Sequence, residues 1–485
     1  MIIFISDLHL TDGTFDYMKD DPNNHVPHDI SHEAFKLFWD QVYRIYKANK
    51  GESKINEIKL VLLGDICEMR STTGWVASDY ERDGKTRKLK YRPWKEDKSG
   101  PSKICKEILE GILKHNEKIF RYLSPKKFDE VEKDNGLRLL VEELGKDKIK
   151  IEYVSGNHDR LINFYDEDSL VKKYIEKELG WTTPEVDKDR GFKFEDKDIG
   201  ILADHGHKDD FIDYYKDYKK APIGALLSDL LGRLMYHVQE KENKELIRFC
   251  MNIDNVRPSS DRLTWVASNI EKLSEDNLEV LREVLLTGIS ELNQDSDVIF
   301  DFLYERLKGK IKFFHKVILG IVGIFTDKKK FLKKWITKIL AKIERRLKET
   351  EGKDLKTIFD DIQRVISKLM PKKKKKKEDQ DQDFHYYKRA EKESEEGYNY
   401  VVYGHSHRYK LIPLTTQKER KVFYFNTGTW KRTVQKNLLP LKTKEPDFQK
   451  WSRMTYVNFF SRKRKENKDH IFDVWHGNLQ VEGDV

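Results

Sequence analysis

The sequence predicts an α/β fold whose core is divided by a large α-helical insertion. Short runs of β-branched, leucine and aromatic residues occur near both ends of the chain, and each run ends in a polar turn, which is typical of buried strands. Between about residues 211 and 397 these runs give way to apolar residues at helical spacing. The length of 485 residues exceeds the limit of about 250–300 residues for a single core, so we expect more than one packed unit.

Five of the strand-like runs precede clusters of polar residues. They are Ile2–Ile5, Leu60–Leu63, Ile149–Val154, Ile199–Leu202 and Tyr400–Tyr403. Val422–Phe425 and Ile471–Trp475 are predicted as late strands of the same sheet system. Ligands of open α/β sheets bind at the edge where strand ends meet, so the five polar turns predict a functional site there.

The insertion is recognised by its helical periodicity. Leu263 to Leu292 shows an apolar stripe, and a second stripe recurs at four-residue steps in Phe331, Trp335, Ile339, Ile343 and Leu347. Residues 371–383 are of low complexity and are predicted to be a linker. The predicted organisation is a core at 1–210 with a cap-like insertion at about 66–148, a basic helical insertion at 211–397, and the rest of the core at 398–485.

Positive charge is concentrated in one segment. The whole chain has a net charge of +9, but residues 301–377 contain 25 Lys and Arg against 9 Asp and Glu, so the other residues sum to −7. Such a segment attracts polyanions, and nucleic acid is the predicted partner. The alternatives are a solvated linker at Lys372–Lys377 and a membrane-interfacial helix at Ile311–Phe325.

Cysteine usage and hydropathy predict a cytoplasmic protein. Cys67, Cys105 and Cys250 are odd in number and far apart, which argues against a disulfide framework. The first apolar run is interrupted by Asp7, too early for a secretory leader. No run reaches the roughly 18–20 apolar residues of a membrane span, so no transmembrane segment is expected.

The polar turns supply carboxylate, imidazole and amide donors and no thiolate. The donors are Asp7, His9, Asp65, Asn157, His158, His205, His405 and His407. Such donors suit Mn²⁺, Fe or Zn²⁺. A carboxylate between two groups of nitrogen donors is what a two-metal hydrolytic site requires. The Asp-x-His and His-x-His spacings place both side chains on one side of an extended chain.

The same turns resemble the calcineurin-like metallophosphoesterase superfamily. Five blocks occur in the order of that family: Asp7-Leu8-His9, Gly64-Asp65, Gly156-Asn157-His158-Asp159, His205, and Gly404-His405-Ser406-His407. The resemblance covers roughly residues 1–210 and 398–485. It implies a two-layer β-sandwich flanked by helices and a metal-dependent hydrolysis of phosphoesters.

The resemblance also implies a role for each donor. Asp7, His9 and His407 would bind the first divalent ion. Asp65 would bridge the two ions, and Asn157, His205 and His405 would bind the second. The ions are expected to be Mn, with Fe or Zn as alternatives. His158 would donate a proton to the leaving oxygen, and Asp159 would orient it. An imidazole held by a carboxylate has the near-neutral pKa that this task needs.

Two local features look like the UDP-diacylglucosamine pyrophosphatases of lipid A synthesis. These are Gly64-Asp65-Ile66-Cys67-Glu68 and the Asp-His-Gly around His205. That subgroup has Arg where this chain has His158, and His-Gly-Asp where this chain has His-Gly-His, so its substrate is not transferred. Arg160 and Arg408 flank two of the turns and are predicted to contact substrate phosphate, with surface ion pairs as the alternative.

The predicted reaction is hydrolysis of a phosphodiester or pyrophosphate, with nucleic acid or a nucleotide as the favoured substrate. One alternative is a phospholipid or lipid-linked pyrophosphate at a membrane surface. The other is a scaffold protein that uses the fold to bind a partner.

Overall fold

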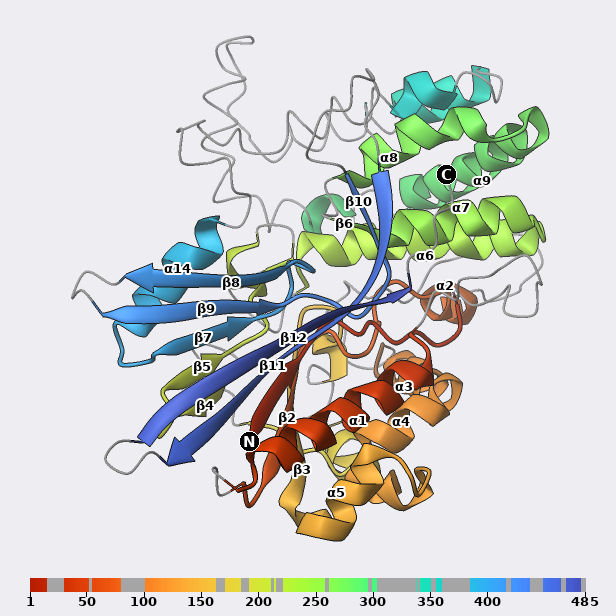
Figure 1. The fold of residues 1–485 in the computed structure, drawn as a ribbon. Coiled ribbons are helices and arrows are strands. Elements are labelled where there is room, and N and C mark those ends of the chain that lie inside the picture. Colours follow the sequence, from red (N-terminus) through yellow and green to blue (C-terminus); the bar gives the residue numbers. More distant parts are fainter. Residues whose placement is uncertain are drawn as a thin grey trace.

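The computed structural model shows a mixed α/β protein built on two sheets (Figure 1). The residues that it describes are 1–14, 30–51, 55–79, 101–162, 171–184, 192–210, 213–214, 221–257, 261–294, 299–302, 338, 341–349, 355–359, 384–415, 420–436, 448–463 and 468–480.

The first sheet has seven strands within the described residues. Three of them run parallel: β1 (Ile2–Ile5), β2 (Ile58–Leu63) and β3 (Ile149–Val154). The sheet order is β3-β2-β1-β11-β10-β6, and β12 pairs with β11. The remaining strands are β6 (Val256–Arg257), β10 (Thr433–Lys436), β11 (Phe448–Lys463) and β12 (Lys468–Gln480).

The second sheet has five strands in the described part of the chain, in the order β4-β5-β7-β9-β8. Its strands are β4 (Phe194–Asp196), β5 (Ile201–Ala203), β7 (Tyr400–Tyr403), β8 (Tyr409–Thr415) and β9 (Lys421–Thr427). β5, β7 and β9 are parallel to one another. The two sheets pack face to face through apolar side chains such as Phe4, Val61, Val402, Phe425 and Val457.

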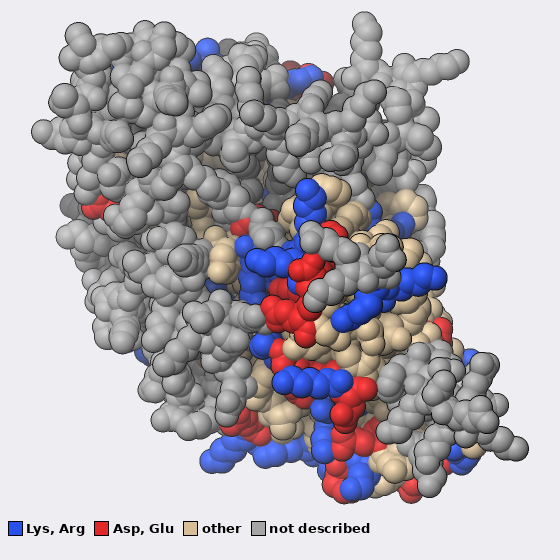
Figure 2. Space-filling model, turned by 90° about the vertical axis from the view of Figure 1, so that its left-hand side faces the viewer, with Lys and Arg blue, Asp and Glu red and all other residues tan. Residues whose placement is uncertain are grey.

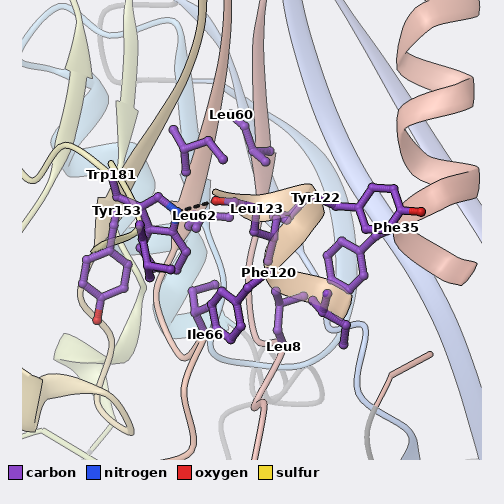
Figure 3. Packing of buried hydrophobic residues seen from close by; sticks show 14 of the residues in the cluster. Leu8, Phe35, Leu60, Leu62, Ile66, Phe120, Tyr122, Leu123, Tyr153 and Trp181 are labelled. Carbon is purple, nitrogen blue, oxygen red and sulfur yellow. Dashed lines mark hydrogen bonds between the residues drawn. The ribbon is translucent and has the colours of Figure 1, made fainter. Parts of the chain in front are cut away.

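Helices cover the outer faces of both sheets. On the first sheet these are α1 (His32–Asn49), α3 (Pro101–His115), α4 (Glu117–Leu123) and α5 (Gly136–Leu144). Ser31 caps the start of α1, because its hydroxyl accepts the N–H of Glu33 at 3.3 Å. Figure 3 shows the packing beneath these helices, where the indole of Trp181 donates to the carbonyl of Leu123. α14 (Phe384–Ser394) packs on the second sheet through Tyr386 and Ala390.

The predicted insertion forms a helical unit with a core of its own. Its helices are α6 (Ile223–Glu240), α7 (Lys244–Asn255), α8 (Arg262–Asn269) and α9 (Glu275–Gln294). Their apolar faces pack around residues such as Leu246, Cys250, Trp265 and Leu281. α6 packs against α2 (Gly74–Asp79). Gly232 of α6 allows this close approach, because a Cβ there would lie 2.7 Å from the carbonyl oxygen of Thr72, just before α2.

Shorter helical turns complete the described secondary structure. They are η1 (Pro125–Glu130), η2 (Lys146–Lys148), η3 (Arg160–Ile162), η4 (Val171–Glu178), η5 (His207–Asp209) and η7 (Ile270–Lys272).

The strand predictions are largely confirmed. β1, β3 and β7 have the predicted bounds, β2 begins two residues earlier than predicted, and β5 covers Ile201–Ala203 rather than Ile199–Leu202. The two late strands lie in different sheets, as parts of β9 and β12. β4, β6, β8, β10 and β11 were not predicted from the sequence. β6 and β10 have only two and four residues, too few to show a pattern.

Two features differ from the predicted insertion. The stripe from Leu263 to Leu292 is divided between α8 and α9, because Ser274 interrupts it and accepts the N–H of Asn277 at 3.3 Å. α14 and β6 fall within the predicted range of 211–397, yet α14 packs on the second sheet and β6 joins the first.

Several predicted features lie outside the described residues. They are Lys372–Lys377, Ile311–Phe325 and most of the stripe that begins at Phe331, of which residues 341–349 are described as helical. Cys67, Cys105 and Cys250 are buried free thiols. Within the described part of the chain, no helix combines the length and apolar character needed to cross a bilayer.

Candidate metal centre

The polar residues that follow five strands meet between the ends of the two sheets. Asp7 and His9 follow β1, and Asp65 follows β2. The turn after β1 is joined to the turn after β2 by backbone hydrogen bonds, from Asp7 N–H to the carbonyl of Gly64 at 3.0 Å and from His9 N–H to that of Asp65 at 2.8 Å. These bonds hold the turn after β1 beside the turn after β2.

The other three turns complete the ring of donors. Asn157 and His158 follow β3, His205 follows β5, and the His405–His407 turn follows β7. The backbone N–H of His405 donates to Asp7 Oδ2 at 2.9 Å, so the second sheet is tied directly to the turn after β1.

The backbone of these turns is unusual. Six described non-glycine residues have φ in the left-handed region, and five of them are candidate metal ligands, with φ between 47° and 67°: Asp7, His9, Asp65, His405 and His407. Each such conformation costs about 1–3 kcal/mol and is typical of functional sites. The predicted reason for the Asp-x-His and His-x-His spacings is therefore wrong. The side chains converge because each ligand turns the chain, and not because the chain is extended.

Two glycines allow the turns to approach this closely. A Cβ on Gly156 would lie 2.2 Å from Asp65 Oδ1, and a Cβ on Gly404 would lie 2.6 Å from Asp7 Oδ2. In the absence of these Cβ atoms, the N–H of His158 reaches Asp65 Oδ1 at 2.7 Å. One oxygen of each aspartate is thus fixed by the backbone, and the other oxygen faces the centre.

The first cluster consists of Asp7, His9 and His407. His407 Nε2 lies 3.3 Å from Asp7 Oδ1 and 3.1 Å from His9 Nε2, and all three side chains are buried. Among the described residues, none donates a hydrogen bond of normal geometry to Asp7 Oδ1. A buried carboxylate oxygen and two convergent imidazole nitrogens are a suitable set of ligands for a metal ion.

The second cluster consists of Asp65, His205 and His405. His205 Nε2 lies 3.0 Å from Asp65 Oδ2 and 3.0 Å from the amide oxygen of Asn157. Asp65 Oδ2 is also 3.8 Å from His9 Nε2, so this one oxygen contacts both clusters. Like Asp7 Oδ1, it is buried and accepts no hydrogen bond of normal geometry from the part of the chain that the structure describes.

The electrostatics favour positive charge at the centre. Burial alone would raise the pKa of Asp7 and Asp65, but neighbouring imidazoles, above all His407 and His205, hold both values well below the usual range. Burial would likewise lower the pKa of His205, but Asp65 and Asp7 raise it to about 10. Two ionised carboxylates in a buried site require a compensating cation, and a metal ion can replace these protons.

His158 is paired with a carboxylate other than the predicted one. Its Nδ1 lies 2.9 Å and 2.7 Å from the two oxygens of Glu68. The oxygens of Asp159 instead accept backbone N–H groups, from Ile66 at 2.8 Å and Gly156 at 2.6 Å. The prediction that Asp159 orients His158 is therefore wrong, because the Asp159 carboxylate is turned back onto the two loops that carry the ligands.

Glu68 lies between His9 of the first cluster and the candidate acid His158. It is 1% exposed, and its Oε2 lies 3.0 Å from Nδ1 of His9. The same carboxylate thus contacts a candidate metal ligand and the candidate acid His158. Burial would raise the pKa of Glu68, but His158 and His9 keep it well below its ordinary value. Burial lowers the pKa of His158, and Glu68 opposes that effect. The sequence contained Glu68 in a recognised block but did not indicate its partner.

The two predicted substrate arginines lie at the margin of the centre. Burial raises the pKa of the Cys105 thiol, and the positive charge of Arg160 opposes this effect. Burial likewise raises the pKa of Asp261, and the positive charge of Arg408 opposes it. No hydrogen bond from either guanidinium to a ligand of the two clusters is seen in the described residues.

Residues of the predicted insertion contact the centre instead. Arg257 on β6 donates from Nε to Nδ1 of His407 at 3.2 Å. At the end of the first part of the core, just before the insertion, Asp210 Oδ2 lies 3.2 Å from Nε2 of His405. Asp213, which pairs with Arg70 at 2.9 Å, is close to His405 and His158. No sequence signal indicated these contacts, since they depend on where the insertion packs.

Comparison of the chain with models of known protein families and with curated proteins finds no match. The buried His, Asp and Glu groups of the site are suited to hold a metal ion.

Proposed function

We propose that this chain is a dinuclear metal-dependent phosphoesterase of the calcineurin-like metallophosphoesterase type, and that its two packed sheets are the sandwich of that superfamily. The observation that supports this most directly is the position of Asp65 Oδ2. It lies 3.0 Å from His205 Nε2 and 3.8 Å from His9 Nε2, between two clusters of nitrogen donors. A carboxylate in this position is suited to bridge two ions.

The donor set fits a pair of divalent ions. In this proposal Asp7, His9 and His407 hold one ion, and Asn157, His205 and His405 hold the other, with Asp65 shared between them. Oxygen and imidazole donors without thiolate favour Mn, and Fe or Zn accept the same ligands. When bound, such ions supply Lewis-acid stabilisation to the oxygens of a displacement at phosphorus.

The chain's own residues supply the proton. His158 Nδ1 faces Glu68, so its N–H is donated to that carboxylate and the ring is held in one orientation. This arrangement leaves Nε2 to carry the proton to the departing oxygen. The side chain is 13% exposed, which gives it access to a substrate while most of the ring stays packed. Such positioned acids contribute about 10²–10⁴-fold in rate.

We propose phosphodiesters and pyrophosphates as the substrate class, without a preference for nucleic acid or lipid. The segments expected to bind nucleic acid or a membrane, Lys372–Lys377 and Ile311–Phe325, lie outside the described residues. On the face shown in Figure 2, the described Lys and Arg side chains are interleaved with Asp and Glu. That part of the surface gives no reason to prefer a polyanion.

The test combines metal analysis, thermal unfolding and turnover of bis(p-nitrophenyl) phosphate with Mn²⁺. Wild type should hold close to two ions per chain. At a free Mn²⁺ concentration of about 100 times Kd, binding should stabilise the fold by about 2.7 kcal/mol for each occupied site, and EDTA should remove that gain. Asp65→Asn should lose most of the metal and the stabilisation, whereas Asp40→Asn, a change on α1 away from the site, should keep both. Unchanged metal content in Asp65→Asn would exclude the bridging role.

A further inference from the structure

A small polar pocket of about 10 Å³, enough for a single oxygen atom of a ligand, lies at His407. It is lined by His407 itself, three further basic residues and three threonines, with Tyr409, Gly428 and Gln435 completing the wall. The three further basic residues are Lys431, Arg453 and His476, and the threonines are Thr429, Thr433 and Thr455. No carboxylate belongs to the lining. A pocket that offers hydroxyls and cations, next to a site proposed to bind a phosphoester, is suited to an anion.

The pocket continues the interface between the two sheets. Along β11 the residues Phe459 and Val457 face the other sheet and are buried in the apolar core. Thr455 and Arg453 lie two and four residues before Val457, on the same face of the strand. The interior face therefore changes from apolar to polar at the edge where the metal centre lies.

Arg453 supplies a cation that no described carboxylate neutralises. Its guanidinium stacks on the ring of Trp451 at 4.1 Å, which holds it in place. Its Nε is buried and has no hydrogen-bond acceptor within the described part of the chain. A buried donor without an acceptor is costly, so an oxygen ligand at this position would stabilise the arrangement.

His476 and Thr455 fix the neighbouring wall. Thr455 Oγ1 lies 2.8 Å from Nδ1 of His476, whose ring stacks on Tyr409 with centroids 5.2 Å apart. The cross-strand pairing of Thr455 with His476 places both side chains on one face of β11 and β12. This leaves Nε2 of the imidazole available to a ligand.

The two sides of the metal centre differ in charge. On the side of His407, the insertion adds Arg257, and its Asp254 is already paired with Lys431. On the side of His405 lie the carboxylates of Asp210, at the end of the first part of the core, and of Asp213 in the insertion, which is paired with Arg70. A substrate with a second negative group would therefore bind with that group on the His407 side.

We infer that the substrate carries a second phosphate beside the one that is cleaved, and that this phosphate binds over the pocket and places one oxygen in it, between Arg453 and His476. This inference rests on the proposed phosphoesterase function. The second phosphate has two possible chemical sources. It is either the neighbouring phosphate of a polynucleotide or a phosphate linked directly to the first, as in a pyrophosphate.

The experiment measures binding by calorimetry at a fixed ionic strength of about 0.15 M, so that screening is the same throughout. Thymidine 3′,5′-bisphosphate is compared with thymidine 5′-monophosphate, and pyrophosphate with inorganic phosphate. The variants are Arg453→Gln and, as a charge-matched control at the start of β9, the exposed Lys421→Gln. Circular dichroism checks that each variant is folded.

Wild type should prefer one of the doubly phosphorylated ligands by about tenfold or more, the worth of one charge-assisted contact. In Arg453→Gln the ratio of the affinities for the doubly and the singly phosphorylated ligand should fall to about one. In Lys421→Gln it should stay as in wild type. The ligand pair that shows the preference identifies the source of the second phosphate. No preference in wild type for either pair, or the same preference in Arg453→Gln, would overturn the inference.

Turnover separates this inference from the proposed function. If wild type hydrolyses bis(p-nitrophenyl) phosphate but shows no preference, the phosphoesterase stands and the second-phosphate site is wrong. If the preference is present and lost in Arg453→Gln, but no phosphodiester or pyrophosphate is hydrolysed with Mn²⁺, the anion site stands and the proposed function is wrong.

Discussion

Glu68→Gln should impair the proposed enzyme more than any other isosteric change outside the metal ligands. The carboxylate is buried and makes four contacts. It accepts the N–H groups of Arg70 at 3.0 Å and Ser71 at 2.8 Å, and it faces Nδ1 of His158 at 2.9 Å and of His9 at 3.0 Å. Glutamine keeps the shape but replaces one acceptor oxygen by an NH₂ donor and removes the charge.

The free energy that Glu68→Gln removes from each imidazole contact follows from the change in hydrogen bonding. A hydrogen bond to a charged group contributes about 1.5–3 kcal/mol and a neutral one about 0.5–1.5 kcal/mol, so each imidazole loses roughly 1–1.5 kcal/mol. If the amide oxygen keeps the two backbone donors, the NH₂ group faces Nδ1 of His9. With His9 bound to metal through Nε2, that nitrogen is itself a donor, and the contact becomes repulsive. Loss of such a partner of a metal-bound histidine typically lowers metal affinity about 10–100-fold.

The assay compares Glu68→Gln with Asp159→Asn in metal titrations and in pH–rate profiles. Glu68→Gln should bind metal more weakly and, at saturating metal, lose about tenfold or more in kcat for an alkyl leaving group, since one weakened charge-assisted bond is worth about a factor of ten. Asp159→Asn should mainly lower stability, because its carboxylate accepts backbone N–H groups from Ile66 and Gly156. If Glu68→Gln matched wild type in both measurements while Asp159→Asn lost the alkyl-ester activity, the assignment of Glu68 would be refuted.

Three further changes test other parts of the structure. His158→Ala should keep its metals but lose about 10²–10⁴-fold in rate for a poor leaving group, with a smaller loss for a nitrophenyl ester; equal losses would indicate that His158 positions the substrate. Gly156→Ala places a Cβ 2.2 Å from Asp65 Oδ1, so thermal unfolding should show a loss of about 1–3 kcal/mol together with weaker metal binding. Gly51→Ala, where no atom lies within 4 Å, is its control, and equal effects of the two changes would contradict the close packing at Gly156. If the basic segment binds nucleic acid, replacing Lys372–Lys377 by Ser should flatten the salt dependence of binding, whose slope is about −0.7 to −0.9 per phosphate contact; an unchanged slope would exclude a role for these lysines.

The sequence alone was sufficient for the strands that carry the site. β1, β3 and β7 could be predicted because each is a short apolar run bounded by polar residues, and this pattern is local. The donor residues could be predicted for the same reason, since each follows its strand directly. Their chemistry, carboxylate and imidazole without thiolate, is also a property of the residues themselves and does not depend on the fold.

The conformation of the ligand turns could not be predicted. Asp7 and His9 were expected on one face of an extended chain, but both have positive φ. An isolated dipeptide avoids this conformation, because the Cβ of an L-residue is crowded there. The turns adopt it because long-range contacts compensate for the strain, such as the hydrogen bond from His405 N–H to Asp7 Oδ2. Those contacts join residues 398 positions apart in the sequence.

The partners of the site were likewise decided by tertiary structure. Asp159 is next to His158 in the chain, yet Glu68, 90 residues away, contacts the imidazole. Arg257 reaches His407 only because β6 pairs with β10. Local sequence therefore determined which residues follow the strands and what ligands they offer. Only the packing of strands and loops decided which side chains meet, because the free energy that brings them together comes from contacts between segments that are distant in the sequence.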